Sequence, residues 1–494
     1  MSPPASRPRP TKARATASRK APAPPSRKSD RAGPDSPSRP EVKEGLEILD
    51  RMLGFVHGDA DARFYEDRWT TLRCANSRLY QPHWESTRAV SLRVAVEGGK
   101  LGVAMTTDLS PEGLRAVVEQ ATSLARVAPP APGFHGFAKD PGGPTPEIPF
   151  STKVLAHDLE KLGDKIAAAF SIVEENLGPA RISGVYNQGY SLLAVANTNG
   201  LRRGHRRSAA QASILTELPE KDPPVSGWAE GSHWDPSRVD LTSLAKEAVE
   251  ATPRTAPKAV GPGKYRVLLM GPAVSELTGH LSWLGLGASS VEEGWSFLTT
   301  GTGQKLVSPN FELSDDPFCS EGLPSSIDFE GLPHQVRPVF EDGRAHGPAH
   351  DTLTAARAGT TSTKNAMPPE APFGEMGPLP LHLTMKPGDL DRNELVKELK
   401  EGVVVTRFWY VRAVHPGKTI ITGMTRDGTY WVENGEIKHP IRNLRFTESI
   451  LSTLAGVEAV GEQRRCYSDE RGYIAPVLAP IVSKEFTFTS ATTF

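Results

Sequence analysis

The stretch SELTGHL, Ser275 to Leu281, has the form of a zinc-protease helix, with a glutamate, Glu276, close to a histidine, His280. Zinc peptidases use this combination because imidazole nitrogens bind the metal while the carboxylate acts as a general base toward water. A serine, Ser275, stands where the first metal-ligating histidine is expected. The stretch is therefore a working metal site, a degenerate one or an ordinary helix.

Ser275 changes the coordination chemistry that this stretch can support. A catalytic zinc keeps about three protein ligands and one open position for water. A neutral hydroxyl is a poor donor to zinc and is not ionised at neutral pH, so affinity falls steeply without the imidazole. Positions five apart on a regular helix also lie about 140° apart around its axis. Residues 275 and 280 therefore share a site only on a distorted or terminating helix.

The cysteines and the charged clusters offer fewer sites. Cys74, Cys319 and Cys466 are far apart and form no CxxC pair, so no disulfide framework or structural zinc ribbon is predicted. An acidic group in Pro- and Gly-rich loops could bind a divalent ion, but we expect solvated turns. Its members are Asp315, Asp316, Asp328, Glu330, Glu341 and Asp342. The basic run Arg202 to Arg207 could face an acidic partner, but on an alternating strand we expect a solvent-exposed face.

The first forty residues differ in composition from the rest of the 494-residue chain. They contain ten Pro, ten Lys or Arg and two Asp, and almost no large apolar residue, so a disordered tail is predicted. This tail carries +8 and the whole chain −1, which leaves about −9 on residues 41–494. An acidic body argues against nucleic-acid binding. Because neither a signal peptide nor an apolar run of about 18 residues is present, we expect a cytoplasmic protein that crosses no membrane.

The hydrophobic pattern beyond residue 41 alternates between helix and strand periods. Helical stripes are expected at 46–56, 110–127 and 155–173, and period-2 strands lie between and after them. We expect strand-joining turns at Asn76-Ser77, Gly98-Gly99, Asn187-Gln188-Gly189, Asn199-Gly200, Arg426-Asp427-Gly428 and Asn434-Gly435. A late helix is expected at Asp391–Lys400.

These elements predict an α+β fold, with N-terminal helix-plus-antiparallel-sheet domains followed by a mainly antiparallel β C-terminal domain. The predicted division is a basic Pro-rich tail at 1–40, an N-terminal α+β domain at 41–130, a linker at 131–150, a middle α+β segment at 151–255 and a β-rich domain at 262–494 that carries the SELTGHL helix.

Motifs spread over residues 41–480 resemble the TldD/PmbA family, also called TldD/TldE, whose members are described as modulators of DNA gyrase and as metallopeptidases. The landmarks are LSPEGL, GHL, FLTTGTGQKLVSP, SSIDFEGLPHQVRPVFEDG, EGVVVT, ITG and YWVENGEIKHPI. Each is weak alone, but their order and spacing together are specific. The last one favours the PmbA/TldE branch.

The resemblance implies a division of labour between two branches. In the TldD branch a His-Glu-x-x-x-His motif and a downstream Cys hold zinc, whereas the TldE branch lacks the motif and serves as partner subunit. On this chain Ser275 falls at the first His, Glu276 at the Glu, His280 at the second His and Cys466 at the downstream Cys. The resemblance thus assigns Glu276 as the catalytic candidate, and His280 and Cys466 as ligands of a vestigial metal site.

The leading hypothesis is a PmbA/TldE-like subunit of a cytoplasmic metallopeptidase that degrades unfolded or leader peptides. The family's zinc would lie in the catalytic subunit and none in this chain, and the partner would be a TldD-like subunit or a second copy. One alternative is a self-sufficient metallopeptidase that uses Glu276, His280 and Cys466. Another is a non-enzymatic binding protein that uses the basic tail.

Overall fold

The computed structural model describes residues 41–494 except 157, 222–223, 371, 470–471 and 493–494. The chain divides into two units, residues 1–37 and 38–494, and every described element belongs to the second. The tail predicted at 1–40 lies outside the described residues. None of the described helices combines the length and the apolar composition that a bilayer-crossing helix needs.

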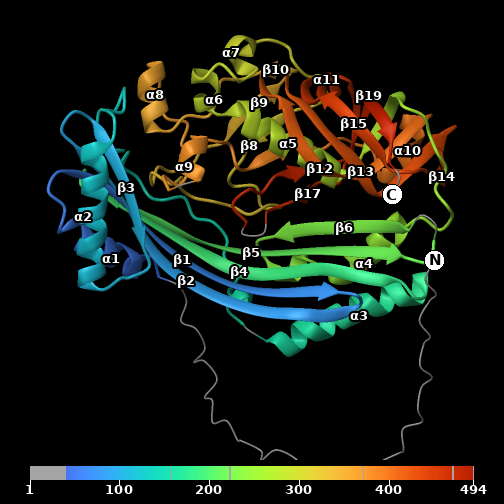
Figure 1. The fold of residues 1–494 in the computed structure, drawn as a ribbon, viewed down its shortest axis with the longest axis horizontal. Helices are drawn as coiled ribbons and strands as arrows, with labels where there is room; N and C mark the ends of the chain where they lie inside the picture. Colours follow the sequence, from blue (N-terminus) through green and yellow to red (C-terminus); the bar gives the residue numbers. More distant parts are fainter. Residues whose placement is uncertain (1–40, 157, 222–223, 371, 470–471, 493–494) are drawn as a thin grey trace, which may run out of the picture. The chain divides into compact units, whose positions relative to one another are not determined.

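Two amphipathic helices pack beside the first strands. Helix α1 (Val42–Leu53) buries Ile48, Leu49 and Met52, and helix α2 (Pro111–Val127) adds a second apolar face to the same core. Helix α2 begins as predicted, since Ser110 accepts a hydrogen bond from the Gly113 N–H at 3.1 Å. Both helices stand at one end of the sheet, next to β3 (Figure 1).

Long antiparallel strands form the centre of the fold. They are β1 (Asp59–Ala75), β2 (Arg78–Val96), β3 (Lys100–Thr106), β4 (Arg181–Asn197), β5 (Arg202–Leu218) and β6 (Val225–His233). The turns at Asn76-Ser77, Gly98-Gly99 and Asn199-Gly200 are confirmed, and the first two have positive φ angles at both residues. The turn predicted at residues 187–189 is wrong: β4 continues through it because these residues stay paired with both β1 and β5.

Helices α3 (Leu159–Leu177) and α4 (Leu241–Ala251) cover one face of strands β4 to β6. Leu162, Ile166 and Val173 of α3 and Leu244 of α4 share a core with Ile214 of β5. The C-terminal segments lie on the opposite face of these strands (Figure 1). This second face holds the features that bear on function.

The C-terminal elements start with β7 and end with β19. The helices are α5 (Gly271–Leu281), the π-helical η3 (Ser282–Leu286), α6 (Ala288–Glu292), α7 (Leu298–Gly301), α8 (Thr352–Ala358), α9 (Phe373–Met376), α10 (Arg392–Leu399) and α11 (Ile450–Ala455). The strands are β7 (Gly263–Leu269), β8 (Leu313–Asp315), β9 (Arg337–Glu341), β10 (Arg344–Ala345), β11 (Leu383–Met385), β12 (Gly402–His415), β13 (Ile420–Glu433), β14 (Glu436–Pro440), β15 (Leu444–Ser449), β16 (Val457–Val460), β17 (Arg465–Cys466), β18 (Val477–Leu478) and β19 (Ile481–Ala491).

The structure tests three of the C-terminal predictions. The Asn434-Gly435 hairpin and the helix near 391–400 are confirmed, and Val432 pairs with Ile437 across the hairpin. The turn predicted at Arg426-Asp427-Gly428 is wrong. Strand β13 runs through this segment, and the positive φ angles of Asp427 and Gly428 accompany an irregular register with β12.

The strands assemble into two sheets. The larger has twelve strands in the order β10-β9-β8-β11-β18-β17-β6-β5-β4-β1-β2-β3, and the smaller has seven around β12, β7, β19, β15 and β13. The α+β class predicted from the sequence is confirmed. The predicted domain boundaries stay predictions, but the larger sheet contains strands from all three of the predicted folded segments.

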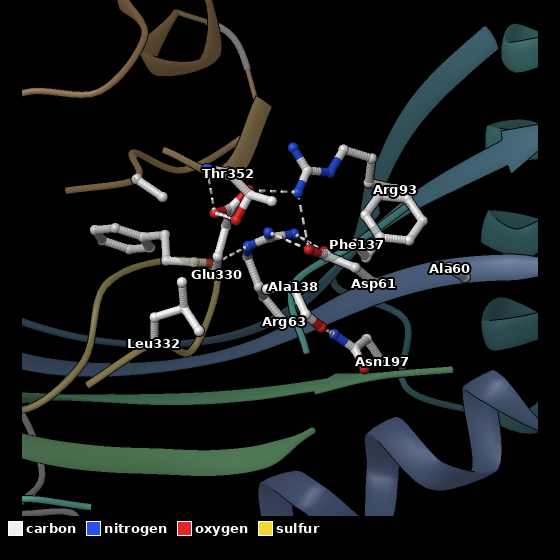
Figure 2. A network of polar contacts seen from close by, with 12 residues as sticks. Ala60, Asp61, Arg63, Arg93, Phe137, Ala138, Asn197, Glu330, Leu332 and Thr352 are labelled. Carbon is white, nitrogen blue, oxygen red and sulfur yellow. Dashed lines mark hydrogen bonds and ion pairs between the residues drawn. The ribbon is translucent and has the colours of Figure 1, made fainter. Parts of the chain in front are cut away.

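A buried network of charges joins β1 and β2 to the C-terminal part (Figure 2). Asp61 and Arg63 of β1 are both 0% exposed and form an ion pair. Arg93 of β2 binds the Asp61 carboxylate at 2.9 Å and the Glu330 carboxylate at 3.3 Å. Glu330 in turn accepts a hydrogen bond from the Thr352 backbone N–H at 2.9 Å. The four buried charges, those of Asp61, Arg63, Arg93 and Glu330, thus neutralise one another where β1 and β2 meet the C-terminal part.

The burial of three acidic residues overturns part of the prediction that this acidic group lies in solvated turns. Glu341 and Asp342 are exposed, as expected for solvated turns. Asp315, Asp328 and Glu330 are instead almost fully buried. Asp328 accepts hydrogen bonds from the backbone N–H groups of residues 330, 332 and 366, so it holds its loop together from inside. The Pro- and Gly-rich composition did not indicate this, because the partners lie far away in the sequence, as Arg93 of β2 does for Glu330 and Asn365 for Asp315.

We predict that Asp61→Asn lowers the free energy of unfolding by about 3 kcal/mol at pH 7, because it leaves two buried guanidinium groups short of a counter-charge. Burial raises the pKa of Asp61, but Arg63 and Arg93 outweigh this and hold it below its usual value. The ionised carboxylate therefore stabilises the fold above about pH 4, and this contribution is lost as the pH falls through the lowered pKa.

Denaturant unfolding of the full chain measures the effect. Glu44→Gln is the matched control, since it breaks an exposed ion pair with Arg88 and should change stability by less than about 1 kcal/mol. Equal stabilities of the two variants would contradict a structural role for the network.

Candidate functional site

Helix α5 follows directly from the buried strand β7. Pro272 lies in its first turn, where the missing N–H costs nothing. Its apolar face, with Val274, Leu277 and Leu281, is buried in the core of the C-terminal part. Ser275, Glu276 and His280 are left partly exposed on the remaining surface of the helix. The helix changes to π form directly after Leu281, which places the distortion predicted for this motif just beyond His280.

The structure brings Glu276 and His280 together. The His280 Nδ1 lies 3.0 Å from the Glu276 backbone oxygen and 3.6 Å from its carboxylate Oε1. Because a carbonyl oxygen can only accept, this geometry puts the imidazole proton on Nδ1 and leaves the Nε2 lone pair available. Metal-binding histidines often have this arrangement. His280 also packs edge-on against Trp283, with ring centroids 6.3 Å apart.

Charged residues from other elements surround Glu276. Burial raises the pKa of its carboxyl, and the guanidinium groups of Arg407 and Arg412 act in the opposite direction. Arg407 is fixed by an ion pair with Asp427 and lies 4.0 Å above the Trp228 ring. The pKa of Glu230 on β6 is also raised by burial. Two acidic and two basic side chains thus share this region.

The structure places Cys466 in a different packing environment from α5. Its side chain is 0% exposed and belongs to an apolar cluster with Trp69, Ala209 and Leu323. Its neighbour Tyr467, by contrast, lies with its hydroxyl against Gly271 at the start of α5. Burial raises the pKa of the Cys466 thiol well above its usual value. The thiol is therefore protonated at neutral pH, whereas a zinc ligand must be a thiolate.

The donor groups of α5 do not fit a catalytic zinc. His280 Nε2 is a suitable donor, but Ser275 supplies only a hydroxyl and the Cys466 thiol lies in a separate apolar cluster. Across the described ranges, no three His, Cys, Asp or Glu side chains are grouped so that they could hold a metal ion. The assignment of Glu276, His280 and Cys466 as site residues remains a prediction.

A cavity at the beginning of α5 was not predicted. It has a volume of about 330 Å³ and lies between β6, α4, the start of α5 and the segment around Arg465. Glu230 and Glu247 line it together with Arg464 and Arg465, and Arg465 binds the Glu247 carboxylate at 2.6 and 2.7 Å. These residues come from distant parts of the chain, so no local pattern could have grouped them. The run Arg464-Arg465 beside Cys466 was the one available signal.

Similarity to known proteins extends over most of the described fold. Residues 262–488 match the PmbA/TldA metallopeptidase C-terminal domain, and residues 60–125 match PmbA/TldA metallopeptidase domain 1. The chain is 23% identical to a protein of Escherichia coli O157:H7 named Metalloprotease PmbA, over 73% of this chain and 78% of that protein. It is 28% identical to a protein of Saccharolobus solfataricus named Zinc metalloprotease TldD homolog, over 45% of this chain and 48% of that protein.

A solved structure has the same fold. The crystal structure of TldE from Thermococcus kodakarensis superimposes with a TM-score of 0.81 and 16% identity, and the match covers 91% of this chain and all of the other. Relatives named after both PmbA and TldD are found, so the similarity does not distinguish the two branches.

We predict that Cys466 resists alkylation in the native protein, because its thiol is buried and protonated. Iodoacetamide at pH 8, followed by mass spectrometry of the peptides, should label Cys466 at least about tenfold more slowly than in the denatured chain. Cys319, which is partly exposed, provides the internal comparison. Rapid native labelling of Cys466 would contradict its placement in the apolar cluster.

Proposed function

Because the chain belongs to the PmbA/TldA metallopeptidase family, we propose that it is a PmbA/TldE-type subunit of a TldD/TldE-type metallopeptidase. In this proposal the chain binds the peptide substrate, and a TldD-like partner chain holds the zinc and performs hydrolysis. The substrates are unfolded proteins or leader peptides, and the complex works in the cytoplasm. The relatives named metalloproteases support the family-level role.

The observation that supports the proposal is the poor set of metal donors around α5. Ser275 replaces an imidazole donor, and the buried Cys466 thiol packs in a cluster apart from α5. One histidine nitrogen is too small a donor set for a catalytic zinc, which keeps about three protein ligands. Hydrolysis by this family then requires a complete set of ligands in another chain.

The cavity near α5 supports the peptide-binding role. Strand β6 borders it, and over Val225–Gly231 its one ladder partner within the described part of the chain is β5, while Arg465 binds the Glu230 backbone oxygen in this stretch. An extended peptide binds such an edge through main-chain hydrogen bonds, which give affinity without strong sequence preference. A volume of about 330 Å³ is enough for one or two side chains of the peptide.

The charges in the cavity would set the orientation and selectivity of the peptide. Arg465 stands beside the carboxylates of Glu230 and Glu247, whereas Arg464 pairs with Glu321, so both signs of charge line the cavity. Arg465 is held by Glu247 and by the Glu230 backbone oxygen at 3.0 Å. Its guanidinium is therefore rigid, which reduces the entropy lost when a peptide binds.

Co-expression with a TldD-like chain that has an intact His-Glu-x-x-x-His motif tests the proposal. We expect the two chains to co-purify and to degrade casein together, and we expect this chain alone to show no hydrolysis. Glu276→Gln in this chain should change the rate of the pair by less than about twofold, because water activation belongs to the partner.

The self-sufficient alternative gives the opposite results. If Glu276, His280 and Cys466 form the active centre, the chain alone degrades casein and Glu276→Gln abolishes that activity. The same Gln replacement at the motif glutamate of the partner is the matched control, and under our proposal it removes the activity of the pair.

A further inference from the structure

A second, smaller cavity lies between the large sheet and the C-terminal segments. It has a volume of about 30 Å³ and is lined by strands β4 and β5 on one side and by residues 325–334, 365–366 and 379–382 on the other. Its polar lining includes His205, Arg207, His334 and His382. This site is separate from α5, whose residues do not line it.

Strand register explains why basic side chains point into this cavity. Arg203, His205 and Arg207 alternate with their neighbours on β5, so all three face the same side of the sheet. His205 pairs with Leu193 and Arg207 with Ser191, and both of these β4 residues also line the cavity. The solvent-exposed face predicted for the basic run is therefore wrong for Arg203 and His205, which are buried.

His382 leaves a hydrogen-bonding atom unused in the cavity. Its side chain is 5% exposed, and its Nε2 is buried without a hydrogen-bond partner among the described residues. Leaving a buried polar atom unpaired destabilises the fold, so a bound ligand or water is expected at this position. The His382 backbone N–H donates to Asp315 at 3.1 Å, which fixes the ring beside the cavity.

Arg207 brings a positive charge to the cavity, and Asp469 and Asp67, which do not line the cavity, act on this charge electrostatically. Its guanidinium donates to the carbonyl oxygens of Pro324 and Leu323 at 3.1 Å each, and of Gly472 at 2.7 Å. These bonds use Nε and Nη2, and no protein partner for Nη1 occurs in the described part. Three carbonyl dipoles position the cation, but they do not neutralise it.

The remaining groups around the cavity make it a donor site. The Ser326 N–H donates to His205 Nδ1 at 3.0 Å, so the proton of the neutral ring lies on Nε2. Burial, reinforced by the charge of Arg207, lowers the pKa of both His205 and His382, and both rings are neutral at pH 7. Asp328, the one acidic group among the described residues of the lining, already accepts three backbone N–H groups.

We propose that this cavity is a binding site for a small monovalent anion of chloride size, held by the Arg207 guanidinium, by the Nε2–H of His205 and by His382 in the tautomer that carries its proton on Nε2. A metal cation is disfavoured because the permanent charge of Arg207 would repel it. A volume of about 30 Å³ gives room for about one or two water-sized groups, so a small ion fits the cavity. The anion would tie β5 to the segment that precedes β11.

Bromide, which replaces chloride and can be located by its anomalous scattering, tests the site directly. In crystals of the full chain soaked in sodium bromide, we expect an anomalous peak in the cavity within hydrogen-bonding distance of Arg207 and His382. A cavity that holds only water, or a metal that is removed by a chelator, would overturn the proposal.

Thermal unfolding provides the solution test. Replacing sodium gluconate by sodium chloride at constant ionic strength should raise the unfolding midpoint of the full chain by about 2 °C in a saturable way. Arg207→Gln should abolish this response. Arg202→Gln is the matched control, because Arg202 lies on the same strand but is exposed and binds Asp50, and it should keep the response. Equal chloride responses of both variants would also overturn the proposal, whether or not Arg207→Gln is less stable.

Discussion

The orientation of the side chains of β17 determines which of them lies beside helix α5. Side chains alternate across a strand, so Arg465 and Tyr467 face one way and Cys466 faces the other. Tyr467 lies against Gly271 of α5, whereas the thiol lies in the apolar cluster around Trp69. Pairing of Cys466 with β6 and with β18 holds this register. A shift by one residue would exchange the two sets of side chains and bring the thiol toward the helix.

One face of the large sheet is covered by the C-terminal segments, and its buried polar side chains depend on those segments for hydrogen-bond partners. Arg63 of β1 reaches the Phe329 backbone oxygen at 2.5 Å, and Arg207 of β5 reaches three further carbonyl oxygens. These guanidinium groups lie where water has little access, so they need the loops that accept their hydrogen bonds. The cavities of about 330 Å³ and about 30 Å³ both lie along this junction. Ligand binding at either one would therefore also stabilise the association of the sheet with the C-terminal part.

The features that could be predicted from the sequence are those that depend on interactions between residues close together in the chain. The stripe Leu162, Ile166 and Val173 placed a helix correctly, and Asn434-Gly435 gave a hairpin because these residues tolerate positive φ angles. Turn residues inside long strands were misleading, as at 187–189, because neighbouring strands on both sides overruled local propensity. The motif predicted Glu276 and His280, whose side chains lie close together. The orientation of the Cys466 side chain and the burial of Glu330 depend instead on contacts between distant segments. No local pattern encodes those pairings.

The most direct test of the central claim is the metal content of this chain, purified alone without chelators and measured by plasma mass spectrometry after dialysis. Because the donors around α5 are too few for a catalytic zinc, we expect far less than one zinc per chain, with weak binding on titration. About one tightly held zinc per chain, lost on replacement of His280, would contradict it.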